Sequence, residues 1–138
     1  MNPALLDTDT LSWVLEGRRS VTSAAERYLA EHRVLTLSEM TRFEVLRGLE
    51  AKRAQARIER FMSFCRTCEV LPITTPILDR AAVVYGELHR AGTLIPDADL
   101  IIGVTALVHG YDMVTNNVRH FSRIPGLRIV NWLDDRGA

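Results

Sequence analysis

The chain has 138 residues, 47% of them hydrophobic, and its 17 lysines and arginines balance 17 aspartates and glutamates, so the formal net charge is zero. This length and composition predict a single globular domain over residues 1–138 and exclude a disordered chain. The balanced charge gives no overall reason to expect a nucleic-acid partner, since nucleic-acid-binding proteins usually carry excess basic charge.

Short strands alternate with longer helical segments along the chain. The first half of the chain is expected to form a strand at 4–6, a helix at 11–15, a helix from Ser20 or Thr22 to about 31, a strand at 33–37 and a helix to 50 capped by Ser38. Helical composition continues over 53–68. The second half is expected to form a strand at 70–73, a helix at 76–90 capped by Thr75, a helix from Pro96 and Asp97 to Gly110, and strands at 113–115 and 127–130. This alternation predicts an α/β/α sandwich with a central parallel β-sheet of about five strands. Ligands of such folds bind beyond the carboxyl ends of the strands.

Three features of the sequence point to the cytoplasm. No apolar run approaches the ~20 residues of a membrane span, and the N-terminus lacks the basic and apolar regions of a signal peptide. Cys65 and Cys68 form a lone C-x-x-C segment, which cannot complete a four-ligand zinc site. We expect structural thiols in a reducing compartment, and no membrane contact.

Asp7 follows directly after the strand at 4–6, at its carboxyl end. An unpaired carboxylate beside a buried strand is unfavourable, so a functional role is one explanation. The alternative is that Asp7 is the N-cap of the following helix.

Glu44 lies in the middle of the helix that Ser38 begins, at the border of its apolar face. It is a second candidate for the same edge of the sheet. Two structural alternatives remain open, namely a capping box with Thr41 and an ion pair with Arg47.

Asp97 and Asp99 lie in the first turn of the helix that Pro96 opens, where the helix dipole favours ionised carboxylates. Either could be the N-cap, but a helix has only one. An apolar run follows Asp99 at once, which makes it the better site candidate.

Thr115 ends the strand at 113–115, and Asn116 and Asn117 follow it, so this segment again places polar residues at the end of a strand. The alternative is a simple turn, which Asn-Asn favours.

Three carboxylates and an asparagine are therefore expected at one edge of the sheet. Two carboxylates about 4 Å apart repel each other by about 4 kcal/mol at an effective dielectric of about 20. A divalent cation would remove this repulsion, and ligands that are all oxygen favour Mg²⁺ or Mn²⁺ over zinc.

Four segments, in this order, resemble a PIN domain, and specifically a VapC-like toxin ribonuclease of type II toxin–antitoxin systems. They are L-L-D-T-D-T-L-S around Asp7, T-R-F-E-V-L-R-G-L around Glu44, P-D-A-D-L-I-I-G-V-T-A around Asp99 and V-T-N-N-V-R-H-F near the end. The resemblance covers essentially the whole chain and implies a PIN-like fold.

The resemblance also implies a reaction, which is endonucleolytic cleavage of RNA that depends on Mg²⁺ or Mn²⁺. Asp7, Glu44 and Asp99 match the family's first three acidic positions, as metal ligands and catalytic residues. The fourth position, often Asp in the family, is Asn117 here. Thr115 matches a position near the site where the family has a hydroxyl side chain. Asp97 is expected to support Asp99 or to cap the helix. Asp9 has no assigned role, and none of the four histidines is required.

The resemblance further implies two protein partners, a cognate antitoxin whose C-terminal tail covers the toxin groove and a second copy in a homodimer. Residues 41–66 hold seven basic and three acidic residues, so their formal charge is +4. This segment, including Arg42 and Arg47, is expected to contact the RNA backbone or a partner. The alternative is a solvated helical face.

The sequence leaves two other functions open. Residues 7–11 superficially resemble the D-x-D-x-T signature of haloacid-dehalogenase-like phosphatases, with Asp7 as nucleophile and Asp9 as acid. However, Leu11 stands in place of Thr, and Lys52, the only lysine, comes too early to bind the phosphate. The second is a catalytically inactive PIN-like binding module, although all three primary acids are present.

Overall fold

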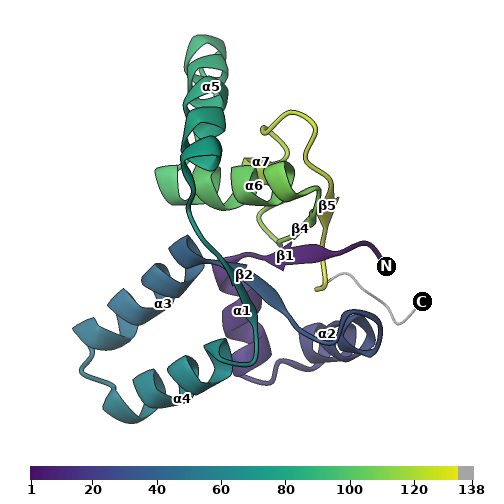
Figure 1. Ribbon diagram of the computed structural model, residues 1–138, viewed down its shortest axis with the longest axis vertical. Helices are drawn as coiled ribbons and strands as arrows, with labels where there is room; N and C mark the ends of the chain where they lie inside the picture. Colours follow the sequence, from purple (N-terminus) through teal and green to yellow (C-terminus); the bar gives the residue numbers. More distant parts are fainter. Residues whose placement is uncertain (134–138) are drawn as a thin grey trace.

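The computed structural model describes residues 1–133 (Figure 1). In chain order its elements are β1 (Ala4–Leu6), α1 (Thr8–Leu15), α2 (Arg19–His32), β2 (Thr36–Ser38), α3 (Glu39–Ala51), α4 (Gln55–Cys65), β3 (Glu69–Leu71), α5 (Thr75–Ala91), α6 (Asp97–His109), β4 (Asp112–Val114), α7 (Val118–Phe121) and β5 (Ile129–Val130). Every predicted strand is present within a few residues of its expected place. The short helix α7 was not predicted.

All paired strands are parallel, as expected, but they form two hydrogen-bonded sheets and not one. One sheet has the order β1-β4-β5, and the other pairs β2 with β3. β1 packs beside β2, yet the two strands cross at an angle (Figure 1). Strands of three residues overlap too little for a ladder across such a crossing, because neighbouring strands are already twisted relative to each other.

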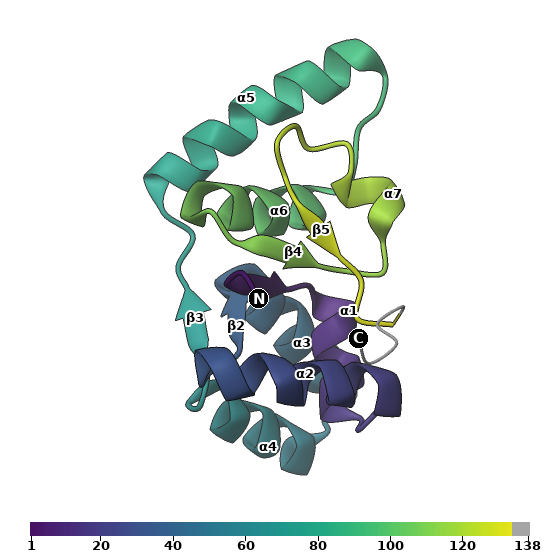
Figure 2. The same cartoon turned by 90° about the vertical axis from the view of Figure 1, so that its right-hand side faces the viewer.

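Helices cover both faces of the strands, which confirms the α/β/α architecture. Leu5 and Met113 pack in one core with residues of α5, α6 and α7. Leu6 and Val114, the next residues along the same strands, pack in a second core with residues of α1 to α4. Successive side chains of a strand point to opposite faces, so each strand contributes to both cores. Figure 2 shows the same division, with the strands between the two groups of helices.

Caps and turns determine where the helices begin and end. Ser38 caps α3 as predicted, and its hydroxyl accepts a hydrogen bond from the Met40 N–H at 3.0 Å. Thr74, and not Thr75, caps α5, because its hydroxyl reaches the Ile77 N–H. Between α3 and α4, Arg53 takes a left-handed backbone conformation with φ +50°. This turn lets α4 fold back against α3 as a helical hairpin.

The two cysteines lie at the end of α4 and just after it, as free thiols. Cys65 is buried and Cys68 partly buried, and burial raises the pKa of both thiols. A raised pKa lowers the thiolate fraction, which fits a structural role. Among residues 1–133, no helix is long and apolar enough to cross a membrane.

Candidate active site

Asp7 occupies both of the positions that the sequence suggested for it. The residue ends β1 and is the N-cap of α1, where its Oδ1 accepts a hydrogen bond from the Thr10 N–H at 2.8 Å. Its Oδ2 accepts one from the Thr115 hydroxyl at 2.5 Å. The register pairs Leu6 with Val114, so the next residues of β1 and β4 lie side by side. Asp7 is therefore held rigidly at the carboxyl end of the sheet.

Burial raises the pKa of Asp7, which is only 5% exposed. The hydrogen bonds from Thr115 and Thr10 act in the opposite direction, and the nearby charge of Asp9 adds to the effect of burial. Within residues 1–133, no lysine, arginine or histidine pairs with Asp7. A buried carboxylate without a counter-charge is a favourable place for a cation.

The raised pKa of Asp7 predicts a pH dependence of stability in the metal-free protein. Below its ordinary pKa of 3.8, the carboxyl is protonated in both the folded and the unfolded state, so burial has no electrostatic penalty. As the pH rises through the higher folded pKa, the folded state must ionise a buried group and stability is lost. We expect Asp7→Asn to become more stable relative to the wild type as the pH rises.

Urea unfolding of both proteins in chelator, between about pH 3 and 8, measures this difference. If the free energies of unfolding of the wild type and of Asp7→Asn changed in parallel over this pH range, burial would not raise the pKa of Asp7 as described.

Glu44 extends from α3 toward α1. Its Oε1 accepts a hydrogen bond from the Thr8 hydroxyl at 2.6 Å, and its Oε2 lies 3.5 Å from an Arg47 guanidinium nitrogen. Thr41 is buried within α3 and its hydroxyl faces Thr8, so the capping-box interpretation was wrong. The ion pair with Arg47 is present, but Arg47 is largely exposed and the pair is loose. The Thr8 hydroxyl is therefore the contact that orients Glu44.

Asp99 lies in the first turn of α6, where neither aspartate is the N-cap. Pro96 occupies that position without a side-chain hydrogen bond. Asp99 Oδ2 lies 2.8 Å from His120 Nδ1. Asp97 is exposed and has no polar contact recorded among the described residues. The structure therefore places Asp99 at the site and leaves Asp97 at its margin.

The residues after β4 form a chain of polar contacts into the site. Thr115 is fully buried, donates to Asp7 and accepts a hydrogen bond from the Asn117 backbone N–H at 2.8 Å. The Asn117 side-chain amide lies 2.8 Å from His120 Nδ1. His120, in the V-T-N-N-V-R-H-F segment, is the histidine nearest the site by sequence, but its contact with Asp99 was not predicted, because a helix of four residues shows no periodicity.

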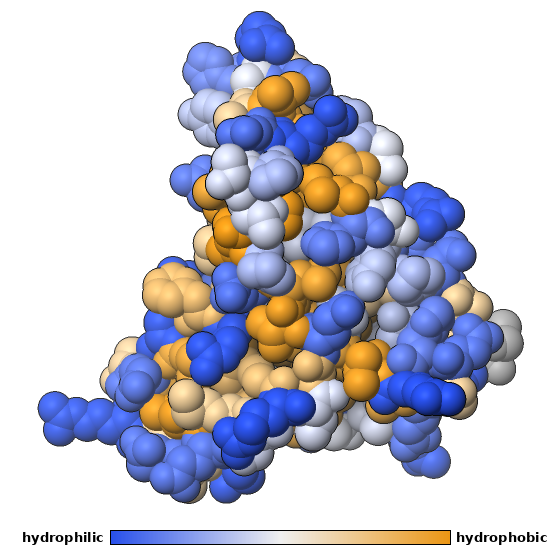
Figure 3. All heavy atoms as spheres, in the orientation of Figure 1, coloured by the Kyte–Doolittle hydropathy of each residue, from blue (hydrophilic) through white to orange (hydrophobic). Residues whose placement is uncertain are grey.

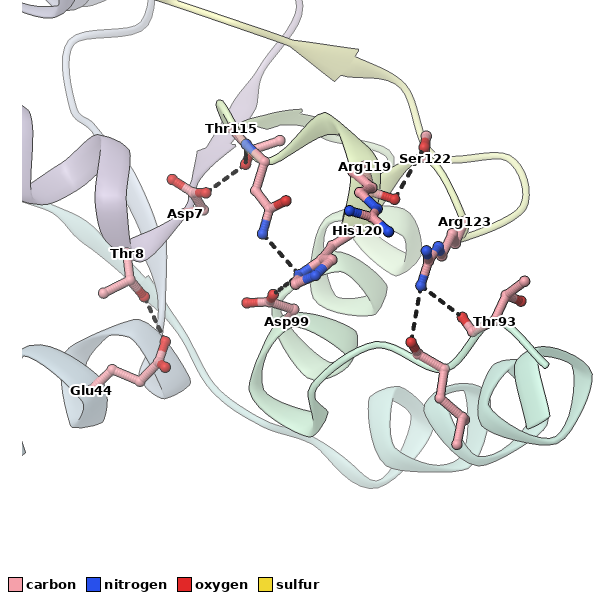
Figure 4. Close-up of polar contacts among 12 residues, drawn as sticks. Asp7, Thr8, Glu44, Thr93, Asp99, Thr115, Arg119, His120, Ser122 and Arg123 are labelled. Carbon is pink, nitrogen blue, oxygen red and sulfur yellow. Dashed lines mark hydrogen bonds and ion pairs between the residues drawn. The ribbon is translucent and has the colours of Figure 1, made fainter.

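The three predicted carboxylates surround one space (Figure 4). Asp7 comes from the end of β1, Glu44 from α3 and Asp99 from α6. Within residues 1–133, no three His, Cys, Asp or Glu side chains are gathered closely enough to form a ready ligand cluster. The donors facing this space are carboxylates and hydroxyls, which suit a hard divalent cation such as Mg²⁺ or Mn²⁺. The donor chemistry therefore fits such a cation.

The basic residues of the α3–α4 hairpin do not form one row. Arg42 and Arg66 line a groove of about 520 Å³ between the two helices. Arg57 and Arg60 line a different groove of about 330 Å³, beside α1. Figure 3 shows apolar side chains in the region of the hairpin with hydrophilic ones around them. These four arginines therefore lie on two different surfaces of the hairpin.

The sequence matches the PIN domain family over residues 4–127. The chain belongs to the PIN domain family. The tRNA(fMet)-specific endonuclease VapC of Salmonella typhimurium is 32% identical over 132 residues, 93% of this chain and 96% of the relative. Ribonuclease VapC19 of Mycobacterium tuberculosis is 32% identical over 124 residues, 90% and 96% of the two chains.

Solved structures agree with these relatives. DNA-bound VapBC from Salmonella typhimurium has a TM-score of 0.79 at 32% identity and covers 96% of this chain and 99% of its own. FitAcB from Neisseria gonorrhoeae shares the fold with a TM-score of 0.83 at 23% identity, over 96% and 99% of the two chains. The predicted resemblance to VapC-like PIN ribonucleases is confirmed, and the interpretation as a haloacid-dehalogenase-like phosphatase is excluded.

Proposed function

We propose that this PIN protein is the toxin of a type II toxin–antitoxin pair and cleaves RNA as an Mg²⁺- or Mn²⁺-dependent endonuclease. The observation that carries the proposal is the arrangement of Asp7, Glu44 and Asp99 around one space, in a chain that matches VapC ribonucleases over nearly its whole length.

Each carboxylate is oriented by a neighbour before any ligand binds. Asp7 is fixed by Thr10 and Thr115, Glu44 by Thr8 and Asp99 by His120. Oriented ligands lose less conformational entropy when the substrate complex forms. A bound divalent ion would supply Lewis acidity toward a scissile phosphate and lower the pKa of a water. One of the three carboxylates would accept the proton of the attacking water.

The proposal is tested with purified protein and total cellular RNA, in Mg²⁺, in Mn²⁺ and in chelator. We expect cleavage at defined positions with either metal and none with chelator. Mapping the product ends then identifies whether transfer, ribosomal or messenger RNA is cut. RNA that is bound but remains intact with both metals would instead support the alternative of a catalytically inactive binding module.

Metal binding also predicts a change in thermal stability. Mn²⁺ should raise the melting temperature of the wild type, because a ligand that binds only the folded state stabilises it by about 2.7 kcal/mol at 100 times its Kd. Differential scanning fluorimetry with increasing Mn²⁺ measures the shift. The Asp7→Asn variant is the matched control and should show a much smaller one. An unchanged wild-type melting temperature at millimolar Mn²⁺ would count against the metal site.

The same proposal includes protein partners and a cytoplasmic location. Solved relatives include VapBC complexes, so we propose a cognate antitoxin for this chain as well. The groove between α3 and α4 suits a partner with apolar and acidic residues, because Phe43 and Met62 are exposed beside Arg42 and Arg66. We assign Arg42 to this groove and Arg47 to RNA contact near Glu44. A homodimer is proposed, and light scattering of the purified protein tests it.

A further inference from the structure

His120 makes a direct contact with Asp99. Its Nδ1 lies 2.8 Å from Asp99 Oδ2, and both side chains are only partly exposed, 31% for His120 and 24% for Asp99. Figure 4 shows the imidazole reaching from α7 to the carboxylate at the start of α6. Among the described residues, His120 is the one hydrogen-bond or ion-pair partner of the Asp99 carboxylate. The direction of the Asp99 carboxylate is therefore set by a single side chain.

The proton of this hydrogen bond has a defined place. An ionised carboxylate can only accept, so Nδ1 of His120 carries the hydrogen and donates it. The Asn117 amide lies 2.8 Å from the same Nδ1. When Nδ1 donates its hydrogen to Asp99, it has no lone pair left for the Asn117 Nδ2–H, so the Asn117 contact is not a second hydrogen bond of this nitrogen. His120 thus acts toward Asp99 through Nδ1, and Nε2 is the nitrogen left for other partners.

Close packing of α7 on α6 explains why the imidazole reaches this position. Gly103 follows Asp99 by one helical turn, so the two lie on the same face of α6. A Cβ at Gly103 would overlap with Ile124 Cδ1 and would lie 3.1 Å from Phe121 Cδ1. Phe121 and Ile124 are both nearly fully buried. The absence of a side chain at Gly103 lets α7 sit directly on α6, with His120 beside Asp99.

We propose that His120 is a positioning residue, which holds the Asp99 carboxylate through Nδ1 in the direction that a divalent cation requires. The proposal rests on the metal-dependent function above and adds a residue outside its carboxylate set. Hydrogen-bond partners of metal ligands typically change metal affinity by about 10–100-fold when they are removed. A histidine that merely lies at the surface, or that contacts RNA, would leave metal affinity unchanged.

Three substitutions distinguish the role of Nδ1 of His120 from that of Nε2. His120→Asn keeps an amide N–H near the place of Nδ1, His120→Gln keeps one near Nε2, and His120→Ala removes both. The readout is the Kd of Mn²⁺ for the full chain without RNA, measured by calorimetry. We expect His120→Ala and His120→Gln to bind Mn²⁺ about 10–100-fold more weakly, and His120→Asn to regain most of the affinity.

RNA cleavage gives a second readout on the same proteins. In His120→Ala, kcat should fall while the KM for RNA stays near the wild-type value, since a residue that contacts RNA would change KM. His109→Ala is the matched control, because this exposed histidine lies about 15 Å along α6 from Asp99. Its Mn²⁺ affinity should equal that of the wild type.

The outcomes distinguish this inference from the function on which it rests. If the wild type binds Mn²⁺ and cleaves RNA while His120→Ala binds Mn²⁺ equally well, the positioning role is wrong and the proposed function stands. Rescue by His120→Gln and not by His120→Asn would also overturn it, because the ring would then act through Nε2. If the wild type itself binds no Mn²⁺, both proposals fail together.

Discussion

Asp7→Asn is expected to lower RNA cleavage by at least ~10³-fold while the protein stays folded. The change removes one negative charge from the proposed cation site, where charge stabilisation of several kcal/mol corresponds to about three powers of ten in rate. The fold should survive because asparagine is also a good N-cap and can still accept the Thr10 N–H. Its amide can donate to the Thr115 hydroxyl in place of the present hydrogen bond.

The measurement compares initial cleavage rates in Mg²⁺ at equal concentrations of folded protein, checked by circular dichroism. Asp9→Asn is the matched control, since Asp9 is two residues away and exposed, and it should keep nearly the wild-type rate. Equal cleavage by Asp7→Asn and the wild type would refute the carboxylate mechanism.

Phe121→Ala is expected to have the largest effect on stability, with a loss of about 3–5 kcal/mol. Phe121 is 1% exposed and fills the space above Gly103. Truncation would leave a cavity between α6 and α7, because the surrounding side chains relax only partly. Urea unfolding followed by circular dichroism gives the free energy of unfolding, and the midpoint should fall with little change in slope.

Phe43→Ala makes the same chemical change on an exposed side chain, since Phe43 is 55% exposed on α3. Its effect should stay within about 0.5 kcal/mol, as for most surface substitutions. Similar losses in both variants would contradict the packing of α7 on α6.

The sequence predicted the positions of Asp7 and Thr115 well, for a physical reason. In a parallel ladder the carboxyl ends of neighbouring strands lie side by side. Here the pairing of Leu6 with Val114 places the ends of β1 and β4 next to each other. Residues that directly follow two such strands must then meet, whatever the details of packing. Asp99 was also placed correctly, because an apolar run after a proline marks the first turn of a buried helix.

Other features depend on contacts that a local pattern does not contain. The pattern indicates strands but not which neighbours form a ladder, so the division into two sheets was missed. The net charge of residues 41–66 does not show which way each side chain points. Arg57 and Arg60 of α4 line one groove, whereas Arg66 at the end of the same helix lines another together with Arg42. The contact of His120 with Asp99 depends on the packing of α7 against Gly103, which no motif around Asp99 reveals.

The division of the strands into two sheets places Asp7 and Glu44 on separate parts of the fold. Asp7 is anchored to the sheet β1-β4-β5, whereas Glu44 belongs to α3, which follows directly from β2 in the other sheet. The Thr8 hydroxyl donates to Glu44 and lies 3.2 Å from the Thr41 hydroxyl, and these contacts tie α1 to α3. A cation held by all three carboxylates would therefore connect the two sheets.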